Sequence, residues 1–360
     1  MKSNDYRFDQ QLATAMTIPA RWYLDPEILR EEKLKIFSRT WQLVGRAEQV
    51  ADPGQYFTSA ICDEPILVVR GADERLRAFS NVCRHRAGPV ASGAGRLKNL
   101  RCGYHGWTYA LDGRLLSTPE FDGVACFDKE ANGLPAFRVE TWEALVFVNL
   151  APSGPSLTET LEDLPARVAH RHLAGMRLAA RRDWYLDCNW KVYVDNYLEG
   201  YHIPIVHPSL NREIDYANYR TETRRFYSIQ HAPLVPRRGA RLRPAATGEE
   251  NEAQYFWIFP NLMLNIYPDN YSTNLIIPLG PERTLTIFEW YFPDPDSAAT
   301  KERITRTVEF SDEIQIEDIR ICEAVQRGLR SRTYRAGRYC VKRENGVHHF
   351  HGLVAEFLAR

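Results

Sequence analysis

The hydrophobic pattern of the first 40 residues is helical. Apolar side chains recur at near-helical spacing between Ile28 and Phe37. Asp25 and Pro26 precede them as an N-cap residue and a proline at the first helical position. We expect residues 1–40 to form a helical segment that packs on a larger domain further along the chain.

The pattern changes to short alternating strands between residues 41 and 150. Segments 56–61 and 65–70 are rich in β-branched and aromatic residues, and Gly, Asp and Pro separate them. The segments 71–74 and 111–114 are typical of hairpin turns. We therefore expect a small all-β domain over residues 41–150.

Residues 151–360 mix helices with strands. After a linker at 151–155, residues 190–201 predict a helix, 255–292 predict an antiparallel sheet, and 301–331 predict a long amphipathic helix. The apolar side chains that face inward in this prediction of the long helix are Ile304, Val308, Ile314, Ile319 and Val325. The whole chain is therefore expected to be an α+β protein.

Composition narrows the class of protein without fixing it. A chain of 360 residues with 44% hydrophobic and 26% charged residues is long enough for two or three globular domains. The formal net charge is zero, so we expect no general attraction to nucleic acid or membrane. Seven scattered cysteines do not suggest a disulfide framework. No signal peptide or apolar span is visible, so we expect a cytoplasmic protein, with a solvated surface loop at 237–251.

Two Cys/His pairs lie on loops of the all-β region. They are Cys83-x-His85 and Cys102-x-x-His105. If the loops approach each other, two thiolates and two imidazoles converge. Such a set can hold zinc, or it can hold a [2Fe–2S] cluster with both cysteines on one iron and both histidines on the other. Zinc fingers usually pair like with like, whereas each pair here mixes one Cys with one His, which favours the iron–sulfur cluster.

A second group of histidines lies about a hundred residues further on. Two histidines and a carboxylate on one face of an iron form the facial triad of non-haem Fe(II) oxygenases, which leaves positions open for O2 and water. His202 and His207 are five residues apart, so a continuous helix would point them in different directions. We expect Pro204 to interrupt the helix and bring both rings to one metal. The alternative is a pair of ordinary core histidines at a helix end.

Together these motifs resemble the Rieske-type ring-hydroxylating and related oxygenases. Segments 81–86 (NVCRHR) and 102–107 (CGYHGW) match the cluster-binding loops of that family, and 189–207 matches its catalytic domain. Respiratory Rieske proteins carry an additional cysteine in each loop, at the places of Gly88 and Tyr104 here, and this difference favours the oxygenase type. The resemblance covers nearly the whole chain.

The resemblance implies a fold and a set of ligands. We expect an all-β Rieske [2Fe–2S] domain over 41–150 and a helix-grip, START-like catalytic domain over 151–360, with an antiparallel sheet and a long C-terminal helix. His202 and His207 would hold a mononuclear Fe(II) with an aspartate on that helix, which the family pattern assigns to Asp318. Glu317 and Glu323 are near enough to be mistaken for it, and without the resemblance Asp318 is a surface charge. The implied cluster ligands are Cys83, His85, Cys102 and His105.

Glu199 lies three residues before His202, so we expect both side chains on one helical face. In the family a carboxylate here links a mononuclear-iron histidine to a Rieske histidine of the neighbouring subunit, which corresponds to His105. Most ring-hydroxylating members have Asp at this position. The glutamate is similar to enzymes that oxidise carnitine, glycine betaine and related quaternary amines. The alternative is an exposed helix charge.

The activity that the resemblance implies is O2 activation with electrons from NAD(P)H. A flavin- or ferredoxin-type reductase would deliver them singly to the Rieske cluster, which passes them to the ferrous centre. The two centres of one chain are far apart in this architecture, and head-to-tail trimers bring together centres of neighbouring subunits. We therefore expect an alpha3 homotrimer.

Two substrate classes remain open. A quaternary amine, monooxygenated to an alcohol or with C–N cleavage, would sit on aromatic faces, and an aromatic acid would need a basic side chain for its carboxylate. Glu199 and the chain length favour the amine. The aromatic candidates, which can also be core residues, are Tyr197, Tyr201, Tyr255, Phe256, Trp257, Phe259, Tyr267 and Trp290. The basic candidates are Arg212, Arg220, Arg224 and Arg225.

Two other classes of protein compete with the oxygenase. A non-catalytic Rieske electron carrier would have no second metal site and a chain about a third as long. A zinc-stabilised binding module on a helix-grip fold would hold no iron at all. The length of the chain and the pair His202 and His207 disfavour the first.

Overall fold

The computed structural model describes residues 6–236, 241–242 and 251–360. Most of the expected surface loop 237–251 lies outside these residues. The chain forms two compact units. The smaller is Phe37–Leu157, and the larger joins the segment up to Ile36 to Thr158–Arg360.

The smaller unit is built from antiparallel strands, as expected. A seven-stranded sheet has the order β1-β10-β9-β4-β3-β2-β5, and a three-stranded sheet has the order β6-β7-β8. Buried Leu67, Phe79 and Tyr109 form one core with Cys83 and Cys102, which anchors the two cysteines to the sheets. The strands are β1 (Gln42–Arg46), β2 (Gln55–Ile61), β3 (Glu64–Arg70), β4 (Leu76–Ser80), β5 (Ala94–Arg96), β6 (Leu100–Arg101), β7 (Thr108–Tyr109), β8 (Leu115–Ser117), β9 (Ala136–Trp142) and β10 (Leu145–Asn149).

The larger unit contains a second seven-stranded antiparallel sheet. Its order is β11-β17-β16-β15-β14-β13-β12, so consecutive strands pair except where β11 joins the edge at β17. The antiparallel sheet predicted over 255–292 is confirmed, and three further strands extend it. The strands are β11 (Arg177–Leu186), β12 (Arg220–Thr223), β13 (Tyr227–Pro233), β14 (Glu252–Ile258), β15 (Leu262–Ile266), β16 (Tyr271–Gly280) and β17 (Arg283–Phe292).

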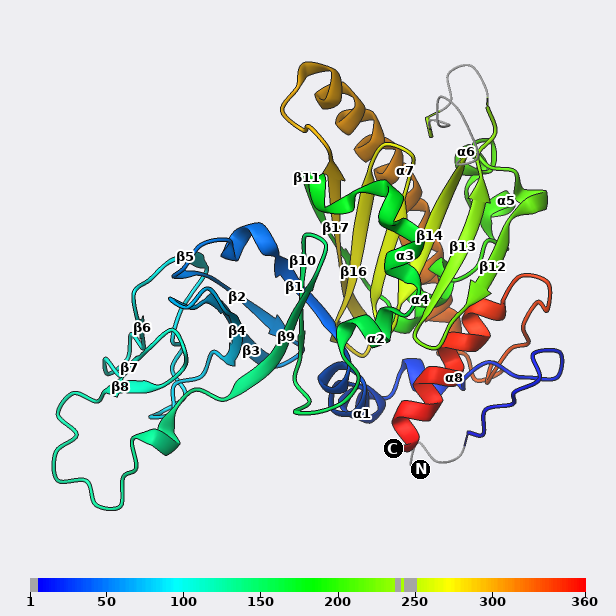
Figure 1. Cartoon of the computed structure of the whole chain (residues 1–360). Helices are drawn as coiled ribbons and strands as arrows, with labels where there is room; N and C mark the ends of the chain where they lie inside the picture. The colour runs from blue at the N-terminus through cyan, green and yellow to red at the C-terminus, as the bar shows by residue number, and fades with distance from the viewer. Residues whose placement is uncertain (1–5, 237–240, 243–250) are drawn as a thin grey trace. The chain divides into compact units, whose positions relative to one another are not determined.

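Helices cover this sheet. The long helix α7 contacts β11, β17 and α4, and α4 also contacts β16, so the two helices lie together on the sheet (Figure 1). This is the helix-grip arrangement that we expected. The helices are α1 (Pro26–Lys35), α2 (Leu157–Leu161), α3 (Leu164–Val168), α4 (Trp190–Tyr197), α5 (Ile203–Val206), α6 (Pro208–Asn211), α7 (Ala298–Leu329) and α8 (Asn345–Ala359).

Capping residues define where the main helices begin. Asp25 accepts a hydrogen bond from the backbone N–H of Glu27 at 2.9 Å, with Pro26 in the first turn, so the predicted start of α1 is confirmed. Ser297 caps α7 through the backbone N–H of Thr300. Asn189 caps α4 through the backbone N–H of Lys191.

Two details of the helix predictions are wrong. Helix α4 ends at Tyr197 rather than at residue 201, and Leu198 forms its C-cap. Val325 of α7 is 44% exposed rather than inward. The buried stripe of α7 passes instead through Cys322, Gln326 and Leu329. Their spacing of four and three residues keeps them on one face, and Val325 lies at the exposed edge of that face.

A buried ion pair joins the N-terminal segment to α4. Lys191 Nζ lies 2.5 Å from Glu32 Oε1, and neither side chain is exposed to solvent. The indole N–H of Trp190 donates to the other carboxylate oxygen at 2.8 Å. Burial raises the pKa of Glu32 and lowers that of Lys191, and the pairing offsets only part of each shift.

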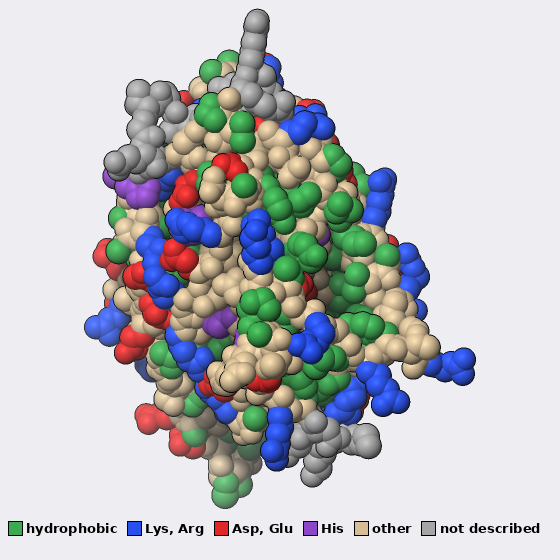
Figure 2. All heavy atoms as spheres, turned by 90° about the vertical axis from the view of Figure 1, so that its right-hand side faces the viewer, with side chains coloured by type: hydrophobic (Ala, Val, Ile, Leu, Met, Phe, Trp, Pro, Cys, Tyr) green, Lys and Arg blue, Asp and Glu red, His purple; other side chains and the backbone are tan. Residues whose placement is uncertain are grey.

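The surface of the chain is mixed in charge. On the face seen in Figure 2, basic and acidic side chains are interspersed, with hydrophobic side chains between them. Within the described part of the chain, none of the helices combines the length and the apolar character that a membrane span requires.

Candidate functional site

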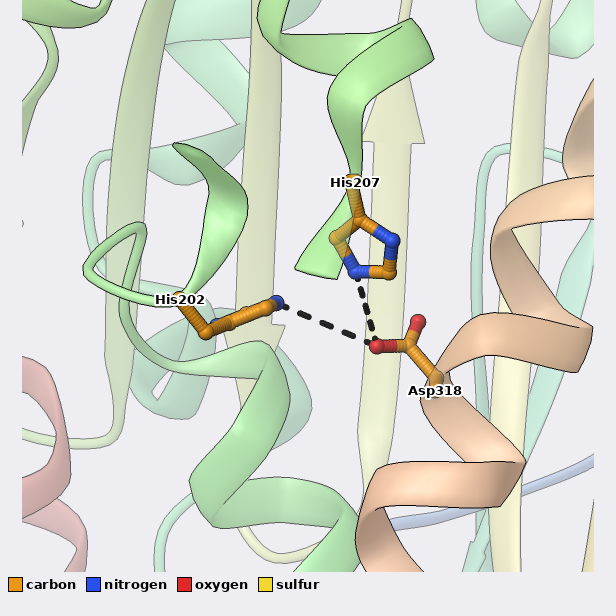
Figure 3. A group of neighbouring side chains, drawn as sticks. All are labelled: His202, His207 and Asp318. Carbon is orange, nitrogen blue, oxygen red and sulfur yellow. Dashed lines mark hydrogen bonds and ion pairs between the residues drawn. The ribbon is translucent and has the colours of Figure 1, made fainter. Parts of the chain in front are cut away.

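Three predicted ligands meet in the larger unit. His202 and His207 lie at the two ends of α5, and Asp318 points toward them from α7 (Figure 3). One ligand atom from each lies within 4.8 Å of the others. Asp318 Oδ1 is 2.9 Å from Nε2 of His207 and 3.8 Å from Nε2 of His202. Two imidazole nitrogens and one carboxylate oxygen facing one point are a donor set that fits a non-haem iron.

The role predicted for Pro204 is wrong. Helix α4 has already ended at Tyr197, and Pro204 lies in the first turn of α5, where its missing N–H leaves no helical hydrogen bond unmade. His202 precedes this one-turn helix, and His207 ends it, with its backbone N–H bonded to the carbonyl of Ile203 at 3.0 Å. The rings therefore converge because one stands at each end of a short helix.

The turn between α4 and α5 depends on a close approach. A Cβ at Gly200 would lie 2.7 Å from the ring of Tyr219, so a larger residue would displace that ring. In this turn Glu199 Oε1 reaches Nδ1 of His202 at 2.6 Å. Glu199 is therefore not an exposed helix charge: its side chain is 11% exposed, and it meets His202 in a turn rather than on a helix face.

A second glutamate holds the other histidine. Glu317 Oε2 lies 2.7 Å from Nδ1 of His207. Burial lowers the pKa of His207, but the hydrogen bonds and charges of Asp318 and Glu317 outweigh it and leave the pKa above its ordinary value. In the sequence Glu317 was only a residue that could be confused with Asp318, and nothing there indicated this contact. Glu323 is not near the histidines and accepts from the backbone N–H of Asp187.

The four predicted cluster residues come together in the smaller unit. Cys83 and Cys102 are buried next to each other, and the rings of His85 and His105 have centroids 4.6 Å apart. Nδ1 of His85 is buried and makes no hydrogen bond within the part of the chain that the structure describes. An unpartnered buried imidazole nitrogen fits a metal ligand.

These four side chains are arranged as two like pairs. Cys102 contacts Cys83, and the ring of His105 lies edge to face against the ring of His85. A pair of thiolates beside a pair of imidazoles fits a cluster of two irons.

The two loops also approach each other closely at the cysteines. A Cβ at Gly88 would lie 3.0 Å from the sulfur of Cys102. The hydroxyl of Tyr109 lies 3.3 Å from the sulfur of Cys83 and accepts from the backbone N–H of Arg84 at 3.0 Å. Sequence reasoning missed Tyr109, which lies on β7 and gave no signal beyond its β-propensity.

A cavity of about 690 Å³ opens beside the triad. One row of its floor crosses five strands, because Gln230, Tyr255, Asn265, Ser272 and Trp290 are successive cross-strand partners. Its roof is a stripe of α7 that leads to Asp318. The residues of this stripe are Arg303, Arg306, Thr307, Glu309, Phe310, Ser311, Glu313, Ile314, Gln315 and Asp318.

Half of the predicted aromatic candidates line the cavity. They are Tyr197, Tyr255, Tyr267 and Trp290. Tyr201 is 55% exposed, and the other three lie in the core. The aromatic lining residues that sequence reasoning missed are Tyr193, Tyr219, Phe288 and Phe310. Tyr193 and Phe310 come from helices α4 and α7, whose position over the sheet no local pattern indicates, and Phe288 comes from β17 of the sheet itself.

None of the four predicted arginines lines the cavity. Three others do, and each is paired with a carboxylate. Arg303 lies 3.2 Å from Asp269, Arg241 pairs with Glu313, and Arg306 pairs with Glu302.

Comparison with known proteins gives the family. Residues 40–128 match the Rieske [2Fe-2S] domain, and residues 175–360 match the ring hydroxylating alpha subunit (catalytic domain). The chain belongs to the Rieske-type ring-hydroxylating oxygenases. As a member of them it is an oxidoreductase with a Rieske [2Fe–2S] domain and a catalytic domain of the family that binds mononuclear iron. The electron-carrier and zinc-module alternatives are therefore excluded.

Relatives within these oxygenases align with almost the whole chain. Choline monooxygenase of Arabidopsis thaliana, a chloroplastic protein, is 36% identical over 95% of this chain and 83% of its own length. The oxygenase subunit of carnitine monooxygenase of Escherichia coli K12 is 34% identical over 95% of this chain and 94% of its own. The quaternary ammonium Rieske monooxygenase CntA, solved with L-carnitine, superposes with a TM-score of 0.84 at 30% identity and covers 96% of this chain and 97% of its own.

Proposed function

We propose that this Rieske oxygenase hydroxylates a small quaternary amine of the choline, carnitine or betaine type. The observation that carries the proposal is the cavity beside the triad, which five tyrosines line: Tyr193, Tyr197, Tyr219, Tyr255 and Tyr267. The rings of Tyr255 and Tyr267 meet edge to face at 6.0 Å. A quaternary ammonium group cannot donate hydrogen bonds and binds instead to aromatic faces, for about 0.5–2 kcal/mol each. The relatives that act on choline and carnitine support the same class.

The competing substrate, an aromatic acid, is less well served by this cavity. Its carboxylate would need a free cation. Arg241, Arg303 and Arg306 are each held by a carboxylate, so a substrate carboxylate would have to compete for a paired arginine. A betaine meets the same cost, but its ammonium group also gains the aromatic faces, whereas an aromatic acid has no cation to place on them.

We assign His202, His207 and Asp318 to the mononuclear Fe(II), and we assign Cys83, His85, Cys102 and His105 to the [2Fe–2S] cluster. When bound, the iron supplies O2 activation. The chain holds both imidazoles by their Nδ1 atoms, so that each Nε2 faces the metal. The tyrosines would hold the cationic end of the substrate, and the remaining cavity would orient a C–H bond toward the metal.

We further propose that electrons from NAD(P)H arrive through a flavin- or ferredoxin-type reductase and cross between subunits of a cytoplasmic alpha3 homotrimer. Exposed apolar side chains beside each end of the link support a contact between copies. Tyr104, next to His105, is 57% exposed, and Ile205, between the two iron histidines, is 84% exposed. Glu199 on Nδ1 of His202 would join the two ends.

The substrate class is tested with purified protein, a matched reductase and NADH. O2 uptake should be coupled to product formation with at least one of choline, L-carnitine, γ-butyrobetaine and glycine betaine, and aromatic acids should give none. Coupled turnover of aromatic acids alone would overturn the proposal.

Replacing Tyr267 by leucine should raise the KM for the accepted amine about 10-fold, since loss of one cation–π contact costs roughly 1.4 kcal/mol. Tyr267→Phe keeps the ring and should stay within about twofold of the wild type. The neutral isostere of choline, 3,3-dimethylbutan-1-ol, separates charge from shape. If Tyr267→Leu weakens its binding as much as that of choline, Tyr267 does not act on the ammonium charge.

Replacing Glu199 by glutamine should slow electron transfer between centres by roughly 100-fold, about 2.7 kcal/mol of barrier. The reason is that Gln keeps the hydrogen bond to His202 but loses the charge that joins the two centres. Single-turnover oxidation of the reduced Rieske cluster, followed by absorbance, measures this rate. A wild-type rate in Glu199→Gln would show that electrons do not pass through this side chain.

A further inference from the structure

Glu317 contacts Nδ1 of His207, the ring nitrogen that the iron assignment does not use. We infer that Glu317 is a positioning residue, which holds His207 in the tautomer and orientation that direct Nε2 at the mononuclear iron. The inference rests on the proposed function, because it presumes that His207 and Asp318 bind iron.

The hydrogen bond of Glu317 determines which nitrogen of His207 carries the proton. Glu317 Oε2 lies 2.7 Å from Nδ1, and an ionised carboxylate only accepts hydrogen bonds. An imidazole that binds a metal is neutral and has a single N–H, so with a metal bound that N–H would stand on Nδ1 and the lone pair on Nε2. Nε2 is the atom that lies 2.9 Å from Asp318 Oδ1. The ring is therefore prepared for a metal at the Asp318 side.

Two consecutive residues of α7, Glu317 and Asp318, contact the two nitrogens of the His207 ring. Side chains of neighbouring helical residues diverge by about 100°. Asp318 uses this divergence to face the cavity, whereas Glu317 does not line the cavity and reaches the far edge of the ring. His207 is almost completely buried between them. The position of α7 therefore sets both Asp318, a proposed ligand, and Glu317, which holds the neighbouring proposed ligand His207.

The two histidines are held in the same way from different elements. Glu199 supports His202 from the turn after α4, and Glu317 supports His207 from α7. Only Glu199 stands on the proposed route of electrons. Glu317 therefore isolates the effect of a supporting carboxylate on iron binding, without the complication of electron transfer. A carboxylate on the second nitrogen makes the imidazole a stronger ligand, and its loss typically weakens metal binding by about 10- to 100-fold.

The experiment compares Glu317→Gln, Glu317→Leu and the control Glu302→Gln, an exposed glutamate of the same helix that is paired with Arg306. Anaerobic competition with a chelator gives the Fe(II) dissociation constant of the mononuclear site. We expect an increase of about 10-fold for Gln, which can still accept the hydrogen bond, and about 100-fold for Leu. The control should equal the wild type. The Co(II)-loaded protein should show a changed d–d absorption spectrum in both Glu317 variants.

A purely structural role would give a different pattern. Thermal unfolding of the metal-free protein should be the same in Glu317→Gln and the wild type, so weaker Fe(II) binding in this variant reports on the ligand. Wild-type Fe(II) affinity in both variants would overturn the inference. It would also be overturned if only Glu317→Leu lost affinity and that variant lost thermal stability as well. A different result would contradict the proposed iron site itself: a wild type that binds no Fe(II), or one whose Fe(II) binding is unchanged by His202→Ala.

Discussion

Replacing Asp318 by alanine should lower product formation by roughly 10³-fold or more, which corresponds to about 4 kcal/mol of barrier. Among the residues that the structure describes, Asp318 supplies the only carboxylate oxygen paired with both Nε2 atoms, at 2.9 and 3.8 Å. Asn196 also donates a hydrogen bond to that oxygen at 2.6 Å, so the carboxylate is held in place before a metal arrives. Without it, two neutral imidazoles face a divalent ion with no charge to balance it. Metal analysis and coupled O2 uptake measure the two losses.

The Rieske cluster provides an internal control for this variant. Its proposed ligands lie in the smaller compact unit, so Asp318→Ala should keep the red-brown colour and the EPR signal of the reduced cluster. Glu323→Gln, on the same helix but bonded to the backbone of Asp187, should keep full turnover. If Asp318→Ala retained both its mononuclear iron and its turnover, the third ligand would have to be another residue.

Replacing Glu32 by alanine should destabilise the larger unit by about 3–5 kcal/mol. The cause is the ammonium group of Lys191, which has no exposure to solvent and would lose the carboxylate 2.5 Å away. The indole N–H of Trp190 would lose its acceptor as well. Urea unfolding of the metal-loaded protein, followed by tryptophan fluorescence, measures the free energy of unfolding.

A double variant separates the buried charge from the packing. Glu32→Leu combined with Lys191→Met removes both charges and keeps similar volumes, so its stability should lie within about 1 kcal/mol of the wild type. A Glu32→Ala variant as stable as the wild type would mean that Lys191 finds another partner or sheds its proton at little cost.

Most of the proposed ligands could be found from the sequence, because those residues lie in short contiguous motifs. Cys83 with His85, and His202 with His207, each occupy a single loop or turn. Asp318 came only from the family resemblance, since nothing in an amphipathic helix distinguishes one inward carboxylate from its neighbours. The support of His207 by Glu317 was missed for the same reason.

Local pattern was also misleading where tertiary contacts decide. Pro204 was expected to break a helix, but the chain leaves α4 earlier, at Leu198, and Gly200 then approaches Tyr219 closely. Tyr219 directly precedes β12, and Phe310 lies in α7. Both line the cavity, and only the packing of α7 over the sheet brings them together. Residues that meet across a hundred positions leave no periodic trace in the chain.

Helix α7 lines the cavity over several successive turns. Its cavity stripe runs from Arg303 to Asp318, 15 residues or about 22 Å of helix. Each turn before Asp318 lies further from the proposed metal site, and Ile314, Phe310 and Thr307 line the cavity on successive turns. We expect substitutions at these positions to change the length of substrate that is accepted while Asp318 stays in place. One helix therefore separates the residues that would select the substrate from the residue that would bind the metal, so either property can change without the other.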